Sequence, residues 1–243
     1  MQNNKEVNLA YLFGICVEKG SELPDNDPNK KYKYRVVFQG NRVVNQDWEA
    51  ATFEDLGSSP ATMESSRACD MFGCAPGHDI EMADAEQAYI QAELKGMPTW
   101  VCLPSDERPE AWKHMKRPAV LLKKALYGHP DSGTFWEQHC DQHVCSVGYR
   151  PVGPEWPSCY YHDELGLFLV IYVDDFKLAG PTENLQAGWD LIMRPSEVAL
   201  CSVSTKTSMT LESSSTNNPA STKAMYAKGK GSGAPSDAQA REK

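Results

Sequence analysis

One stretch of this chain, residues 167–180, combines two apolar runs with a pair of adjacent carboxylates. Seven apolar residues, Leu167 to Val173, run without interruption into Asp174 and Asp175, and a second apolar run ends at Gly180. A continuous apolar run bounded by turn residues is typical of a strand buried on both faces. The two carboxylates interrupt it, which predicts a hairpin with its turn at Asp174 and Asp175.

Two adjacent carboxylates next to a buried strand need an explanation. Like charges about 4 Å apart repel by roughly 4 kcal/mol at an effective dielectric constant near 20. A solvated tight turn avoids this cost by exposure to water, and a bound cation avoids it by neutralisation. Both interpretations are open, and the hairpin residues alone favour the solvated turn.

Two further segments carry candidate functional groups. Residues 78–84 alternate polar and apolar side chains, which predicts a half-buried strand, and residues 85–94 have helical character. Asp84 lies at this junction, where an isolated Asp is more often a helix N-cap than a metal ligand. Residues 30–40 predict a strand with one basic end, in which Lys33 and Arg35 either protect an edge or contact phosphate.

The remaining pattern divides the chain into three parts. We expect an N-terminal segment and linker over 1–27, a globular region over 28–195 and a disordered low-complexity tail over 196–243. Within the globular region, strands are predicted over 100–104, 119–128 and from 158. Helices are predicted from the Ser58-Ser59-Pro60 run, from a Thr134–Glu137 capping box and from Thr182. The second of these helices would bury Phe135, Trp136, Cys140 and Val144.

Composition narrows the class of protein. The chain has 243 residues, 41% hydrophobic residues and a net charge of −9, values typical of a globular protein and unusual for a general nucleic-acid-binding surface. No apolar run is long enough to span a bilayer, and no signal peptide is evident. The eight cysteines form no Cys-x-x-Cys pair. We therefore expect an intracellular protein, cytoplasmic or nuclear, that is neither secreted nor associated with a membrane.

Four motifs, spread over about residues 28–185, resemble those of a known family. Tyr172-Val173-Asp174-Asp175 looks like the Tyr-x-Asp-Asp box of reverse transcriptases, and Asp84 followed by Tyr89 resembles their first catalytic motif. Residues 122–128, Leu-Lys-Lys-Ala-Leu-Tyr-Gly, are similar to a stretch of copia-type retrotransposon polymerases, and residues 33–37 look like the strand that opens their fingers. The chain thus resembles the RNA-directed DNA polymerase part of a copia-type Pol polyprotein, in truncated form.

The resemblance implies a fold, a reaction and a set of site residues. The expected fold is α+β, a right-hand polymerase with fingers and an antiparallel palm sheet backed by helices, and with the thumb largely missing. The expected reaction is nucleotidyl transfer from a dNTP to a primer 3′-hydroxyl on an RNA or DNA template, with two Mg²⁺ ions, or Mn²⁺. The implied metal ligands and catalytic residues are Asp84, Asp174 and Asp175. The implied nucleotide-binding residues are Tyr89, Arg35, Lys33 and Tyr172.

Other interpretations remain open at this point. The chain could be a catalytically inactive remnant of a retrotransposon that binds nucleic acid weakly or not at all, or an unrelated metal-dependent phosphohydrolase. His139 and His143 share a helix face at a spacing found in metal sites, although a half-exposed helix with buried thiols is the simpler interpretation. Several cations are candidates for backbone contacts with nucleic acid or for solvated surface: Lys30, Lys31, Lys113, Lys116, Arg117, Lys123 and Lys124.

Overall fold

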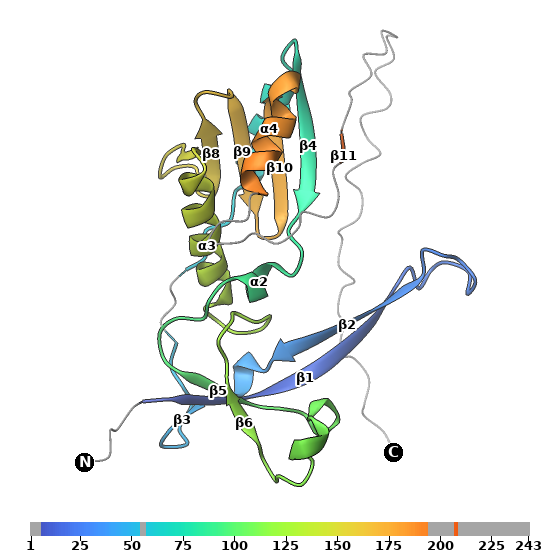
Figure 1. The fold of residues 1–243 in the computed structure, drawn as a ribbon, viewed down its shortest axis with the longest axis vertical. Helices are drawn as coiled ribbons and strands as arrows, with labels where there is room; N and C mark the ends of the chain where they lie inside the picture. Colours follow the sequence, from blue (N-terminus) through green and yellow to red (C-terminus); the bar gives the residue numbers. More distant parts are fainter. Residues whose placement is uncertain (1–5, 54–56, 194–206, 209–243) are drawn as a thin grey trace, which may run out of the picture. The chain divides into compact units, whose positions relative to one another are not determined.

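The computed structural model describes residues 6–53, 57–193 and 207–208. These residues form an α+β protein with two β-sheets and four α-helices, as the sequence predicts for the class (Figure 1). The expected low-complexity tail, 196–243, lies outside the described residues except for the two-residue strand β11 (Thr207–Ser208). None of the helices described is long and apolar enough to cross a membrane.

The larger sheet contains the predicted hairpin. Its strand order is β11-β4-β10-β9-β8-β7, and each pair of neighbours is antiparallel. Strand β9 ends and β10 begins on either side of the two-residue turn Val173-Asp174. The predicted hairpin is confirmed, but its turn lies one residue earlier than expected, and Asp175 is the first residue of β10. The strands are β4 (His78–Asp84), β7 (Arg150–Pro151), β8 (Cys159–His162), β9 (Leu167–Tyr172) and β10 (Asp175–Pro181).

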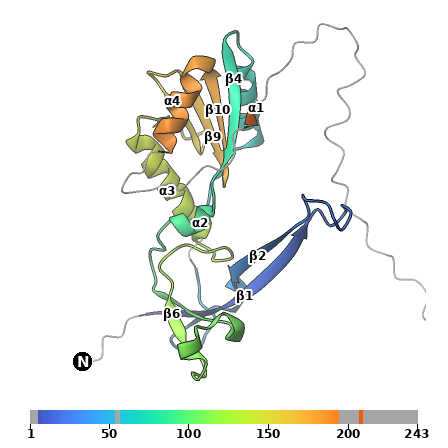
Figure 2. The same cartoon turned by 45° about the vertical axis from the view of Figure 1, so that its right-hand side comes forward.

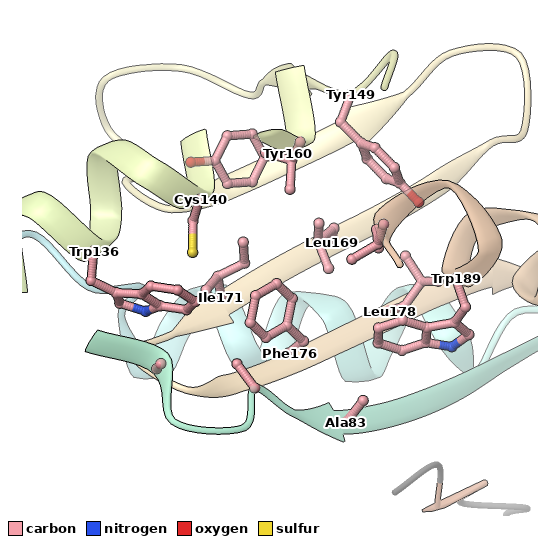
Figure 3. Packing of buried hydrophobic residues seen from close by; sticks show 14 of the residues in the cluster. Ala83, Trp136, Cys140, Tyr149, Tyr160, Leu169, Ile171, Phe176, Leu178 and Trp189 are labelled. Carbon is pink, nitrogen blue, oxygen red and sulfur yellow. The ribbon is translucent and has the colours of Figure 1, made fainter. Parts of the chain in front are cut away.

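Both faces of this six-stranded sheet are covered, which explains the uninterrupted apolar run in β9. Leu167, Leu169 and Ile171 point into a cluster with α3 (Ser132–Ser146) and α4 (Thr182–Ile192) (Figure 3). Phe168 and Val170 face a second cluster that includes Cys69 of α1 (Met63–Gly73). Figure 2 shows α1 on the opposite face of the sheet from α3 and α4. Alternate side chains therefore have separate cores, as expected for a strand between two layers.

The smaller sheet has the order β2-β1-β5-β6, with β3 paired to β1. Its members are β1 (Asn8–Lys19), β2 (Lys31–Phe38), β3 (Val44–Asn45), β5 (Thr99–Cys102) and β6 (Ala119–Leu121). Strand β1 is antiparallel to β2 and parallel to β5. Much of the segment expected to precede the globular region thus forms a central strand of this sheet, and only the following turn residues match the predicted loop.

Several predicted boundaries need correction. Helix α1 begins at Met63, after the run of Ser and Pro, because the Thr62 side chain accepts from the Ser65 N–H and caps it there. Helix α3 begins at Ser132, so the capping box predicted from Thr134 is wrong. The Glu137 carboxylate instead accepts from the backbone N–H of Ser59 at 2.9 Å, a contact between segments far apart in sequence.

Two other predicted elements are shorter than expected. Strand β6 ends at Leu121, and residues 122–128 continue as irregular chain. Tyr127 in this segment lies beside the end of β2, where its carbonyl accepts from the Phe38 N–H. The helix after Asp84 is reduced to α2 (Ala88–Gln91). The helix predicted from Thr182 is α4, and Pro181 precedes its first residue. The Thr182 hydroxyl donates to the Gly77 carbonyl instead of capping the helix.

Candidate functional site

The carboxylates that the sequence singled out meet at one end of the six-stranded sheet. In the β4–β10 register Asp84 lies directly opposite Asp175, and Asp174 occupies the adjacent turn. All three residues are exposed. Residues 84 and 175 are 91 positions apart in the sequence, so only strand pairing places them side by side. Asp84 is therefore the last residue of a strand and not the N-cap of a helix.

The turn that carries Asp174 is strained. Val173 has φ of +56°, in the left-handed region, which β-branched side chains rarely adopt. Such a conformation costs of order 1–3 kcal/mol and persists only where the surroundings enforce it. Strain of this kind is found preferentially at functional sites. The turn is thus a specified feature of the fold.

Two hydrogen bonds from neighbouring elements hold the turn. The backbone N–H of Ala85 donates to the Asp174 carbonyl at 2.7 Å, which ties the turn to the segment that follows β4. The indole N–H of Trp136 donates to the Val173 carbonyl at 2.6 Å, from helix α3. Figure 3 shows Trp136 and Ile171 together at one end of the buried cluster. The two carboxylate-bearing segments are therefore fixed to each other and to the core.

The electrostatics of the pair indicate an excess of negative charge. Burial raises the pKa of the Asp175 carboxyl, and a hydrogen bond to Asp84 and the charges of Asp174 and Asp84 raise it further. A divalent cation would neutralise the same charges, and carboxylate oxygens are the donors that Mg²⁺ prefers.

These carboxylates are therefore suitable ligands for a metal ion in their chemistry, but too few of them are gathered in one place. Asp84 and Asp175 lie opposite each other on paired strands. Among the residues that the structure describes, however, no set of three or more His, Cys, Asp or Glu side chains is gathered closely enough to hold an ion. The structure places Asp174 in the adjoining turn without bringing its carboxylate into such a set.

An aromatic pair lies beside the carboxylates. The rings of Tyr89 and Tyr127 are 4.7 Å apart, edge to face, and the Arg35 guanidinium lies 5.8 Å from the centre of the Tyr127 ring. Burial raises the pKa of both tyrosines, and the charge of Asp174 contributes in the same direction. A connected row of side chains therefore runs from the smaller sheet to the turn, in the order Arg35, Tyr127, Tyr89 and Asp174.

Tyr127 is the residue of this row for which the sequence predicted no role. It belongs to the Leu-Tyr-Gly segment, which was predicted to be a strand. Its backbone carbonyl accepts from the Phe38 N–H at 2.7 Å, and the next residue, Gly128, has φ of +89°. A Cβ at Gly128 would lie 2.2 Å from the Phe38 carbonyl oxygen. The sequence signal that could have identified this segment is an aromatic residue before a glycine, because a glycine indicates a close approach of two backbones and not a regular strand.

Lys33 is within electrostatic range of the carboxylates. Burial lowers its pKa, as do the charges of Arg35 and Lys19, while Asp174 and Asp84 act in the opposite direction. Lys33 and Arg35 occupy alternate positions of β2 and so share one face of the strand. Tyr172 is 55% exposed at the end of β9, where it pairs with Asp175. The structure thus places the predicted basic residues toward the carboxylates and leaves Tyr172 at the rim.

The alternative metal pair on α3 is not supported. His143 is fully buried, and its Nε2 lies 2.7 Å from the Ile192 carbonyl oxygen, so this ring joins α3 to the end of α4. The His139 ring stacks on Trp136 with centroids 5.7 Å apart. The two histidines serve packing, as the simpler interpretation of this helix expected.

No protein-family model matches the chain. The functional proposal therefore depends on the motifs and on the geometry described above.

Proposed function

We propose that this protein is the polymerase domain of a reverse transcriptase of copia type, which transfers a nucleotidyl group from a dNTP to a primer 3′-hydroxyl. The observation that carries the proposal is the β4–β10 register, which pairs Asp84 with Asp175 next to Asp174 in a strained turn. Carboxylates on adjacent strand ends are the usual means of holding divalent cations for in-line nucleotidyl transfer. On this proposal the six-stranded sheet is the palm and the smaller sheet belongs to the fingers.

The carboxylates have a clear role in this reaction. Asp84, Asp174 and Asp175 would hold Mg²⁺ or Mn²⁺. When bound, the metal lowers the pKa of the attacking hydroxyl and stabilises charge on the phosphate oxygens. The raised pKa of Asp175 supports this role, because a site built for cations is left with uncompensated negative charge without them.

The basic and aromatic residues supply the complementary part of the site. The Arg35 guanidinium lies over the Tyr127 ring, with its central carbon 5.8 Å from the ring centre. Its N–H groups would bind phosphate oxygens. Lys33 adds a second cation on the same face of β2, so the two would bind the triphosphate of the incoming nucleotide. Tyr89 packs against Tyr127 beside the carboxylates, where an aromatic ring can exclude a ribose 2′-hydroxyl.

Primer extension tests the proposal directly. Full-length protein is incubated with an oligo(dT) primer on a poly(rA) template, dTTP and Mg²⁺, and product length is measured. We expect extension by the wild type, and a loss of at least a hundredfold in Asp174→Asn, because the charge that binds the cation is removed. Asp106→Asn, which neutralises an exposed carboxylate in the segment between β5 and β6, is the control and should extend normally. Folded protein that gives no extension with either metal would refute the proposal.

A second function is favoured by one specific observation. The described carboxylates do not gather three ligands in one place, whereas the basic face of β2 needs no metal to bind phosphate. A catalytically inactive remnant that binds nucleic acid would therefore retain salt-dependent binding of a primer–template without extension. Fluorescence anisotropy on the same primer–template separates this outcome from an active enzyme.

A further inference from the structure

We propose that Trp136 is a positioning residue, whose indole N–H fixes the backbone of the carboxylate turn Val173-Asp174. The inference builds on the proposed function, since the turn matters for catalysis only if its carboxylates hold the reacting groups. The hydrogen bond to the Val173 carbonyl, 2.6 Å long, reaches the turn from helix α3, which belongs to a different layer of the fold.

The bond acts on the strained residue itself. Val173 has φ of +56°, and a β-branched side chain disfavours this conformation, so the turn tends to relax toward negative φ. Relaxation would reorient the peptide between Val173 and Asp174 and with it the carbonyl that Trp136 binds. A donor fixed in space opposes that rotation. Trp136 is such a donor, because it is only 1% exposed and packed within the main hydrophobic cluster.

Packing beneath the turn gives little additional support. A cavity of about 10 Å³ lies there, lined in part by Trp136, Ile171 and Val173. This is room for about one water molecule. Because side chains do not fill the space, dispersion contacts on that side of the turn are incomplete. The directional hydrogen bond is then the main restraint from α3.

Trp189 provides a matched comparison within the same molecule. It lies on α4, in the same cluster as Trp136, and it is fully buried. Its indole nitrogen is buried without a hydrogen-bond partner among the described residues. Figure 3 shows the two tryptophans at opposite ends of the cluster. Replacing each with Phe removes similar volume, but only the change at Trp136 removes a hydrogen bond to the turn.

Hydrogen exchange measures the effect without any metal or activity. The reporter is the Ala85 amide, which donates to the Asp174 carbonyl and is released when the turn moves. We expect Trp136→Phe to speed its exchange at least tenfold relative to the wild type, and Trp189→Phe to leave it within about twofold. Adding Val173→Gly to Trp136→Phe should restore most of the protection, because glycine adopts positive φ without strain. Protection of Ala85 that is unchanged in folded Trp136→Phe would overturn the proposal.

A second variant covers the case in which Trp136→Phe does not fold. Site-specific 3-benzothienylalanine at position 136 replaces the indole N–H with sulfur and keeps the two-ring shape. The expected result is the same loss of Ala85 protection. Normal protection with this residue would overturn the proposal.

Mn²⁺ binding, followed by electron paramagnetic resonance, separates the inference from the proposed function. If both hold, the wild type binds Mn²⁺ and Trp136→Phe binds it several-fold more weakly, whereas Trp189→Phe binds it normally. Absence of binding by the wild type, together with faster Ala85 exchange in Trp136→Phe, would refute the metal site and leave the positioning role supported. Normal binding and normal exchange in Trp136→Phe would refute the positioning role alone.

Discussion

The stability of this protein should depend on pH through one buried histidine, His129. Its ring is 6% exposed and lies between Phe38 and Phe53, with centroid separations of 4.7 and 5.4 Å. Its Nδ1 accepts from the Asp131 N–H, so the neutral ring carries its proton on Nε2, which has no partner among the described residues. Protonation would break the Nδ1 bond and place a charge between two aromatic rings in an apolar site.

The size of the effect follows from the shift in pKa. Burial lowers the pKa of His129 from 6.5 to about 4. Because the folded-state pKa is depressed, the unfolded state binds the proton first, and stability falls as the pH drops from 6.5 toward 4. At pH 5 the unfolded imidazole is almost fully charged and the folded one is not. This difference corresponds to a loss of about 2 kcal/mol relative to pH 8.

Urea denaturation at pH 8 and pH 5, with His129→Leu and the exposed control His114→Leu, tests this prediction. Other groups titrate over the same range, so the informative quantity is the difference between wild type and variant. We expect the wild type and His114→Leu to lose about 2 kcal/mol more than His129→Leu between the two pH values. The constant cost of removing the Asp131 hydrogen bond cancels in this comparison. Equal losses in all three proteins would refute the assignment of a buried neutral imidazole.

Three further predictions concern the site and its surroundings. Gly128→Ala should destabilise the protein by about 3 kcal/mol in urea denaturation, because a Cβ there meets a carbonyl oxygen of β2 at 2.2 Å. Gly77→Ala is also at positive φ but has no atom within 4 Å, so it should cost about 1 kcal/mol. Similar costs for the two variants would contradict the proposed backbone contact. Tyr127→Ala should raise KM for dNTP about tenfold in primer extension and Tyr127→Phe by less than about twofold, because the Tyr127 ring supports Arg35, which lies over it. An equal effect of the two variants would implicate the hydroxyl instead. Asp84→Asn should raise the metal-free stability by up to about 1 kcal/mol at pH 7, since it relieves repulsion in the carboxylate pair. The same variant should abolish stabilisation by Mg²⁺ in thermal melts. A destabilised variant would show that this pair is not repulsive.

The local pattern was sufficient for the elements whose periodicity depends on burial. The β9–β10 hairpin and strand β4 lie where the sequence predicted them, because runs and alternations of apolar side chains report directly on which faces are covered. The apolar face of α3 was likewise predicted, and Trp136, Cys140 and Val144 are buried. Helix starts were predicted less well. Thr62 and not the earlier serines caps α1, and Glu137 binds a distant backbone amide, so nearby polar residues did not identify which hydrogen bonds form.

The sequence by itself determined that two carboxylates end a buried strand and that a third, Asp84, ends an alternating one. It could not determine that Asp84 and Asp175 are neighbours, because that depends on the register of strands separated by many residues. Tertiary structure also decided the strained φ of Val173, the bond from Trp136 that holds it, and the row of Arg35, Tyr127 and Tyr89 beside Asp174. The bond from Trp136 and the row of side chains are contacts between segments distant in sequence, and such contacts leave no periodic signal in the chain.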